Sequence, residues 1–216
     1  ITDSGGIVCG TALGNVIFQN ININDAQADG SKGYIEGYDA IGSIVGRCYS
    51  APNNTSDNSA YMVTISNCHV SNLRIQGVRK VGGFTGIWGS DCFLTVTNSS
   101  LTNVDVIGER AVEGDDESDR KSTIAGLFVA HTNDAGNVAT QLGNDSATGS
   151  SFTNVTATNC TVVNRYQSLE QPYPWVYFYG GLSVDMTGSN WDTTGSYDTG
   201  VEQAENSLVL FGDMST

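Results

Sequence analysis

The chain has 216 residues, enough for one domain with a substantial core. It has 9 Lys and Arg against 23 Asp and Glu, and this net charge of −14 opposes binding to nucleic acid or to an anionic membrane. No apolar run approaches the length of a membrane-spanning helix, so we expect no membrane insertion. The chain opens at Ile1 without a basic leader, which is typical of a mature or excised segment.

The composition favours strands over helices throughout the chain. Asn, Thr, Ser and Gly are frequent, and all four are poor helix formers. Val, Ile, Thr and aromatic residues favour strands. The chain has only 3 Pro, so almost every residue has a backbone N–H that can donate a hydrogen bond in a sheet. We therefore expect an all-β protein that forms a single domain over residues 1–216.

A glycine-rich block recurs along the chain. Its copies are residues 5–8 (GGIV), 41–46 (IGSIVG), 81–86 (VGGFTG) and 124–129 (IAGLFV), with a degenerate fifth at 179–184 (YGGLSV). Polar inserts of variable length separate the copies, at 50–59, 109–122, 131–150 and 186–200. These inserts are rich in Asn, Asp, Ser and Gly, and we expect them to be surface loops.

An asparagine block accompanies each of the first four glycine blocks, with two Asn five residues apart. Asn tolerates the left-handed backbone of a tight corner, and its amide can donate to one stacked neighbour while it accepts from the other. We expect these Asn to form ladders at the corners of a stacked fold. The expected ladder residues are Asn15, Asn20, Asn67, Asn72, Asn98, Asn103, Asn159 and Asn164.

Short strands at a repeating period, with Gly and Asn at fixed corners, predict a β-solenoid. We expect a right-handed parallel β-helix of four to five coils with loop inserts. The expected copies lie near 4–24, 41–77, 81–108 and 124–166, with a partial copy at 179–216. Each coil would bury its apolar face only by stacking on the next.

The glycine-rich strand followed by the asparagine block resembles the GLUG-type repeat of bacterial surface proteins and adhesins. Residues 81–108 are the best match, and the resemblance covers roughly residues 4–184. It implies a β-helical, non-catalytic body and an extracellular or cell-surface location. It does not imply a particular ligand.

Several residues could form pairs between adjacent coils. Asp105 should lie beside Arg74 as an ordinary cross-strand ion pair. His69 should point outward, with Ser100 and Thr161 stacked above it. We interpret this column as polar side chains that face solvent, since no nucleophile motif is present, and we assign no catalytic residue.

The five Cys residues are not expected to form a zinc site, because the chain contains no Cys-x-x-Cys. Cys68 and Cys160 occupy equivalent positions of their blocks, two coils apart, which is too far for a disulfide. We expect both to be small buried core residues.

Asp115, Asp116 and Asp119 lie in the densest acidic run, at 113–119. Carboxylates could bind Ca²⁺ there, but the run lacks EF-hand spacing and is flanked by basic residues. We favour a solvated loop and expect no metal or cofactor.

Four aromatic residues, Tyr173, Trp175, Tyr177 and Tyr179, alternate along one stretch and would share one strand face. Exposed rings in such a row stack on sugars or anchor a partner protein. The alternative is that the row packs in the core or covers an end of the solenoid, since open ends expose unpaired strands.

Asn53, Asn54 and Asn144 are glycosylation sequons on expected loops.

The functional hypothesis is a non-catalytic extracellular structural or adhesive module. It would present loops and the aromatic face to a glycan or to a protein on another surface. One variant is a filament subunit that self-associates end to end through its open coils. The other class is a carbohydrate-active enzyme, a polysaccharide lyase or hydrolase, which would need acid and base groups clustered on an outer face.

Overall fold

The computed structural model describes residues 4–49, 61–88, 92–108, 124–132, 151–164, 184–185, 190–193 and 213–214. Within these residues every regular element is a β-strand, which confirms the all-β expectation. No helix among them could cross a membrane.

Among the described residues, eighteen strands fall into four groups of equivalent elements, and three short strands follow. The first group is β1 (Ser4–Gly6), β2 (Cys9–Leu13), β3 (Val16–Gln19), β4 (Asn22–Asn24) and β5 (Gly33–Gly37). The second is β6 (Ala40–Gly42), β7 (Val45–Tyr49), β8 (Tyr61–Ser66) and β9 (His69–Gly77). The third is β10 (Lys80–Gly82), β11 (Thr85–Trp88), β12 (Cys92–Thr97) and β13 (Ser100–Gly108). The fourth is β14 (Ile124–Gly126), β15 (Val129–Thr132), β16 (Ser151–Thr153), β17 (Val155–Thr158) and β18 (Thr161–Asn164), and the last strands are β19 (Val184–Asp185), β20 (Asn190–Thr193) and β21 (Asp213–Met214).

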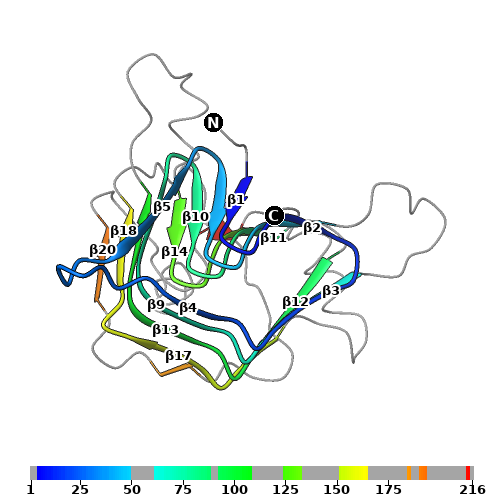
Figure 1. Cartoon of the computed structure of the whole chain (residues 1–216). Helices are drawn as coiled ribbons and strands as arrows, with labels where there is room; N and C mark the ends of the chain where they lie inside the picture. The colour runs from blue at the N-terminus through cyan, green and yellow to red at the C-terminus, as the bar shows by residue number, and fades with distance from the viewer. Residues whose placement is uncertain are drawn as a thin grey trace, which may run out of the picture.

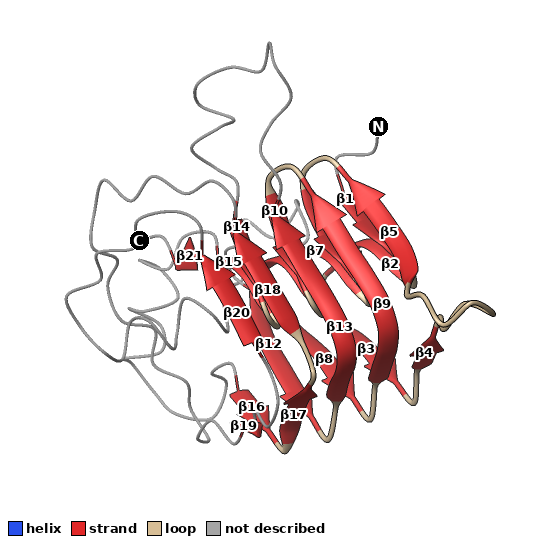
Figure 2. Cartoon of the chain, turned by 90° about the vertical axis from the view of Figure 1, so that its left-hand side faces the viewer, coloured by secondary structure: helices blue, strands red, loops and turns tan. Residues whose placement is uncertain are grey.

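Each group contributes strands to the same four parallel sheets. Sheet A has the order β1-β6-β10-β14 and sheet B the order β2-β7-β11-β15-β21. Sheet C is β16-β12-β8-β3, and sheet D joins β4 and β5 to β9, then β13, then β17 and β18, with β19 and β20 at its far edge. We call the four groups tiers 1 to 4, at residues 4–37, 40–77, 80–108 and 124–164. Figure 2 shows the tiers side by side in chain order.

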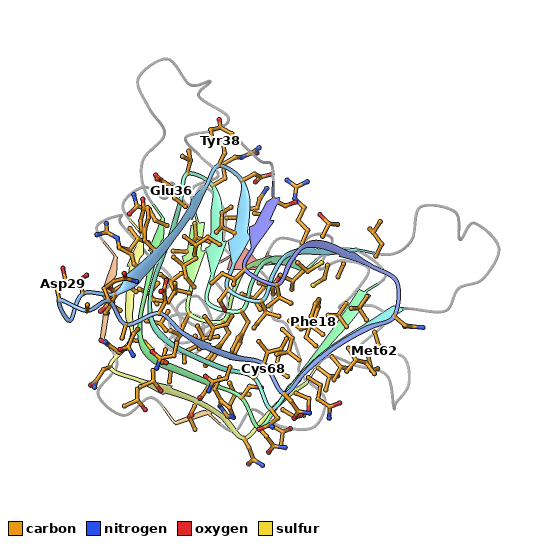
Figure 3. The ribbon with its side chains drawn as sticks, viewed as in Figure 1. Phe18, Asp29, Glu36, Tyr38, Met62 and Cys68 are labelled. Atoms are coloured by element: carbon orange, nitrogen blue, oxygen red, sulfur yellow. The ribbon has the colours of Figure 1, made fainter. Side chains whose placement is uncertain are left out.

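The sheets enclose an interior that is filled by stacked apolar side chains. Figure 1 looks along the stack, and Figure 3 shows Phe18 and Cys68 pointing into this interior. The Phe84 and Phe128 rings of tiers 3 and 4 stack with their centroids 5.7 Å apart. Other fully buried residues also stack at equivalent positions of successive tiers. Val70 of tier 2, for example, pairs with Leu101 of tier 3. Like side chains therefore meet across tiers, and this is the burial that stabilises the stack.

Sheets A and B approach each other closely, which explains the repeated glycines. Gly46 and Gly86 occupy the same position of sheet B in tiers 2 and 3. A Cβ at Gly46 would lie 2.7 Å from the carbonyl oxygen of Ala40, and one at Gly86 would lie 2.8 Å from that of Lys80. A side chain at either position would collide with backbone, so the two sheets require glycine there.

Candidate functional site

The outer corners of sheets C and D are formed by Asn residues with left-handed backbone. Positive φ angles of 48° to 58° occur at Asn20, Asn67, Asn72, Asn98, Asn103, Asn154 and Asn159. Asn tolerates this region better than most residues, because its short amide can hydrogen-bond locally. The corners place each amide directly above its counterpart in the next tier.

The corner amides form hydrogen bonds along the stack. Asn72 Nδ2 donates to Asn24 Oδ1 at 2.9 Å, and Asn103 Nδ2 donates to Asn72 Oδ1 at 2.7 Å. In the second column Asn67 Nδ2 donates to Asn20 Oδ1 at 2.7 Å. The same column continues in tiers 3 and 4, where Asn154 Nδ2 donates to Asn98 Oδ1 at 3.0 Å.

The register of tier 4 differs from the expected one by five residues. Thr158 pairs with Thr102, so Asn159 lies above Asn103, and Asn154 takes the expected place of Asn159 above Asn98. Asn164 is no corner residue: it ends β18, opposite Gly108. The expected register would have put Arg165 at the fully buried position of Val104, whereas the observed one puts Cys160 there. Cys68 and Cys160 are therefore not equivalent.

Tier 1 is also displaced by five residues from the expected register. Asn20, not Asn15, lies beside Asn67, and Asn15 Oδ1 instead accepts a hydrogen bond from the backbone N–H of Met62 at 2.7 Å. The tier continues to Gly37, beyond the expected limit at residue 24, because β5 pairs with β9. The intervening residues 25–32 project from sheet D, with Asp29 near the tip (Figure 3).

His69 links tiers 2 and 3 on the outer face of sheet D. Its Nδ1 lies 2.8 Å from Ser100 Oγ, and its Nε2 lies 3.1 Å from Asn67 Oδ1. The neutral tautomer with its proton on Nε2 satisfies both contacts, since an amide oxygen only accepts. The residue in tier 4 at this position is Thr156, not the expected Thr161. Two hydroxyls and a hydrogen-bonded imidazole make a polar column.

Asp105 of β13 and Arg74 of β9 are partners in the register of the two paired strands. Asp105 Oδ1 also lies 2.6 Å from Lys32 Nζ, at the end of the projecting segment of tier 1. The two side chains of this ion pair are 23% and 25% exposed. Such a partly exposed pair contributes at most about 1 kcal/mol to stability.

Asp39 is the centre of a cationic cluster where sheet D leads into sheet A. Its Oδ2 accepts a hydrogen bond from Arg47 Nη2. Its Oδ1 lies 3.6 Å from Lys80 Nζ and 3.8 Å from Arg79 Nε. The Asp39 side chain is only 10% exposed. One nearly buried carboxylate therefore faces three cations, in a chain whose net charge is −14.

The ladder between tiers 2 and 3 sets up this cluster. Ala40 pairs with Lys80, so Asp39 and Arg79 precede paired strands at equivalent places. Burial lowers the pKa of the Lys80 ammonium below its ordinary value, while Asp39 opposes this and Arg79 adds to it. Removal of the carboxylate would leave this ammonium both desolvated and beside a like charge.

Among the described Cys residues, Cys48, Cys68 and Cys160 are fully buried. Burial raises the pKa of the Cys68 and Cys160 thiols, against the opposing effect of hydrogen bonds with the backbone. A buried thiol whose pKa is raised is a poor nucleophile and a poor metal ligand. Among the described residues no three His, Cys, Asp or Glu side chains converge on a common point.

The remaining predicted site residues lie outside the described residues. These are the aromatic row (Tyr173, Trp175, Tyr177, Tyr179), the acidic run (Asp115, Asp116, Asp119) and the sequons (Asn53, Asn54, Asn144). The Asp39 cluster was not predicted from the sequence. Its signal was present, because Asp39 and Arg79 both stand two residues before a glycine-rich block.

Comparison with protein-family models, with curated proteins and with solved structures gives no match to this chain. The function therefore has to be argued from the geometry of the tiers.

Proposed function

We propose that the chain is a right-handed parallel β-helix that serves as a non-catalytic structural or adhesive module of an extracellular or cell-surface protein, as its resemblance to GLUG-type repeats implies. In this proposal the stacked tiers form a stiff body. The inserts and the aromatic row, residues 173–179, are displayed to a glycan or to a protein on another surface. Residues 1–216 form one domain.

The observation that supports this proposal best is the chemistry of the outward columns. The two corner columns consist of Asn residues that hydrogen-bond along the stack. Beside them stands the His69–Ser100 pair, and sheet C adds a column of Thr64 and Thr95. Neutral polar columns of this kind stabilise stacked strands, and none of them offers the two carboxylates that glycoside hydrolysis requires.

The positions of the inserts also support a display role. Residues 50–60, 89–91 and 133–150 all separate a strand of sheet B from the following strand of sheet C. The corresponding connection in tier 1 is only Gly14 and Asn15. Chain length therefore varies mainly at this corner, and again between sheets D and A at residues 109–123, while the sheets keep their register, which is typical of a scaffold that tolerates variable loops.

A carbohydrate-active enzyme is the second candidate, and the Asp39 cluster is the observation that favours it. A carboxylate beside Arg and Lys could bind an acidic sugar and exchange protons with it. However, Asp39 Oδ2 is engaged by Arg47, and its side chain is nearly buried. Among the described residues the cluster also contains a single carboxylate, so we rank the enzyme below the scaffold.

Binding to a broad glycan array tests the adhesive function. We expect the purified chain to bind a subset of glycans, and we expect Trp175→Ala with Tyr177→Ala to reduce that binding at least about tenfold. Aromatic rings that stack on sugars or anchor a partner contribute enough energy for such a loss. The matched control is Tyr34→Ala, which removes a ring that is 52% exposed on the body of the stack and should leave binding unchanged.

Two results would contradict the adhesive function. One is a wild-type chain that binds no glycan on the array and no cell-surface protein. The other is a Tyr34→Ala variant that loses as much binding as the double variant, because the aromatic row would then have no special role.

A further inference from the structure

Tier 1 is the first tier of the described stack. Within the described part of the chain, β1, β2, β3, β4 and β5 each pair with a strand of tier 2 on one side only. No described strand lies on the other side of β2 and β3, so each can accept a further strand there. Figure 2 shows these strands at the end of the stack nearest the N-terminus. Natural proteins protect such edges, since an open edge pairs with other chains.

This edge lacks the usual protection against pairing. Residues 4–24 contain β1 to β4, and they include no Lys, Arg, Asp, Glu or Pro. The rest of the chain is strongly acidic, with a net charge of −14. Charged side chains and Pro are the common means of blocking an edge, so their absence over this stretch leaves it open to association.

Apolar side chains are exposed on the same tier. Ile7, Val8, Leu13 and Ile17 are 46%, 44%, 52% and 70% exposed, and with Tyr34 they are the exposed large hydrophobic residues of the described chain. All of them belong to tier 1.

The core of tier 1 is incompletely covered as well. Its core-facing residues Val16 and Ile23 are only partly buried, whereas their counterparts Val63 and Val70 in tier 2 are fully buried. A further layer of strands would cover them, as tier 2 covers the core of tier 3.

The opposite end of the stack has a different character. Its described end strands β19, β20 and β21 each contain one Asp: Asp185, Asp192 and Asp213. Contact between two such ends would bring acidic strands together. Residues 4–24 of tier 1, in contrast, carry no charged side chain that would meet a like charge in a second copy.

We propose that the tier 1 edge is a self-association surface, through which two copies of the chain pair head to head by β2 and β3 in a closed dimer. Contact of one surface with its own copy generates a two-fold axis, and strands related by that axis pair in the antiparallel sense. The exposed Leu13 and Ile17 become buried at the contact. Because the two-fold contact uses the tier 1 edge of both copies, no further copy can add through it, and assembly stops at two.

This proposal does not depend on glycan binding. It differs from the end-to-end filament because it predicts a closed dimer and not an open-ended polymer. We infer that the partner on this edge is a second copy of the chain. The edge bends where sheet B leads into sheet C, and a single straight strand could not pair along both sides of that bend. A matching set of bent edges is present on another copy of the same tier.

The test is the mass of the purified chain in solution, measured by light scattering and sedimentation from about 1 to about 100 μM, a range that covers moderate to weak dimers. We expect a dimer. We expect Leu13→Lys with Ile17→Lys to raise its dissociation constant at least about 100-fold, since four like charges would then meet at the contact. Both side chains are about half exposed or more, so the variant should stay folded, as circular dichroism would report.

The matched control is Thr64→Lys with Thr95→Lys. These residues lie in the same column of sheet C as Ile17, but in tiers 2 and 3. The control adds the same charge away from the edge, and we expect it to stay dimeric. A monomeric wild type, an open-ended polymer, or equal dissociation of both variants would overturn the proposal.

Discussion

Gly86→Ala is expected to lower the free energy of unfolding by about 2–3 kcal/mol, although alanine has the higher intrinsic preference for a regular strand. The added Cβ would lie 2.7 Å from the carbonyl carbon of Ala40 and 2.8 Å from the carbonyl oxygen of Lys80, and closer still to the backbone nitrogen of Ile41. These are backbone atoms of two neighbouring tiers, so no side chain can rotate away. Sheets A and B would have to separate. Chemical denaturation measures the change.

Gly10→Ala is the matched control for this variant. Gly10 has the same place in tier 1 that Gly46 and Gly86 have in tiers 2 and 3. The nearest atom to an added Cβ there is the Ser4 carbonyl oxygen at 3.4 Å, an ordinary contact. We expect a change within about 0.5 kcal/mol. Equal losses for both variants would show that the close approach of sheets A and B is not the reason for the glycines.

Asp39→Ala is expected to cost about 2–4 kcal/mol of stability. The substitution leaves Arg47, Arg79 and Lys80 close together without the carboxylate that offsets their charge. Removing one partner of a nearly buried ion pair costs more than the pair itself contributes, because the remaining charges stay desolvated. The comparison of unfolding free energies for the variant and the wild type, at neutral pH and constant salt, measures this effect.

Asp105→Ala provides the comparison for Asp39. Its ion pair with Lys32 is about one-quarter exposed, so we expect a loss of about 1 kcal/mol or less. If Asp39→Ala instead retained wild-type stability, the cluster would not be a structural element. Its three cations would then be better explained as a site for an anionic ligand, and the enzyme candidate would gain support.

The all-β class and the parallel pairing could be predicted from the sequence because local preference and repetition agree. Strand-forming residues fill the chain, and the glycine-rich blocks place Ile41 and Val81 at equivalent, fully buried positions of sheet A. The pairing of Arg74 with Asp105 also follows from counting along tiers 2 and 3. Within the asparagine blocks of these two tiers the residue spacing is the same, so the count along the chain and the stacking agree.

The register of tiers 1 and 4 could not be predicted from the Asn spacing. Asn154, Asn159 and Asn164 are each five residues apart, so two registers satisfy the pattern equally well. The choice depends on which residues reach the interior of the stack, and that requires the neighbouring tier. In tier 1, the insert at 25–32 separates β4 from β5 and hides the end of the tier.

The Asp39 cluster shows a second limit of the sequence. Asp39 and Arg47 are eight residues apart, and Arg79 and Lys80 follow about forty residues later. Only the equivalent places of Asp39 and Arg79, two residues before a glycine-rich block, point to the cluster, and they give no sign of Arg47. These residues meet because parallel stacking places equivalent positions of tiers 2 and 3 side by side, and the bend between sheets A and B returns Arg47 to Asp39.

Disulfide cross-linking between tiers tests the central claim, the parallel stack and its register. Stacked strands are about 4.8 Å apart, which suits a disulfide, and Thr102 pairs with Thr158 across tiers 3 and 4 on the outer face of sheet D. We predict that Thr102→Cys with Thr158→Cys forms this bridge under mild oxidation, as peptide mapping would show. Thr102→Cys with Val163→Cys, the pair that the Asn spacing alone favours, should remain reduced. A bridge in the second variant and none in the first would contradict the stack described here.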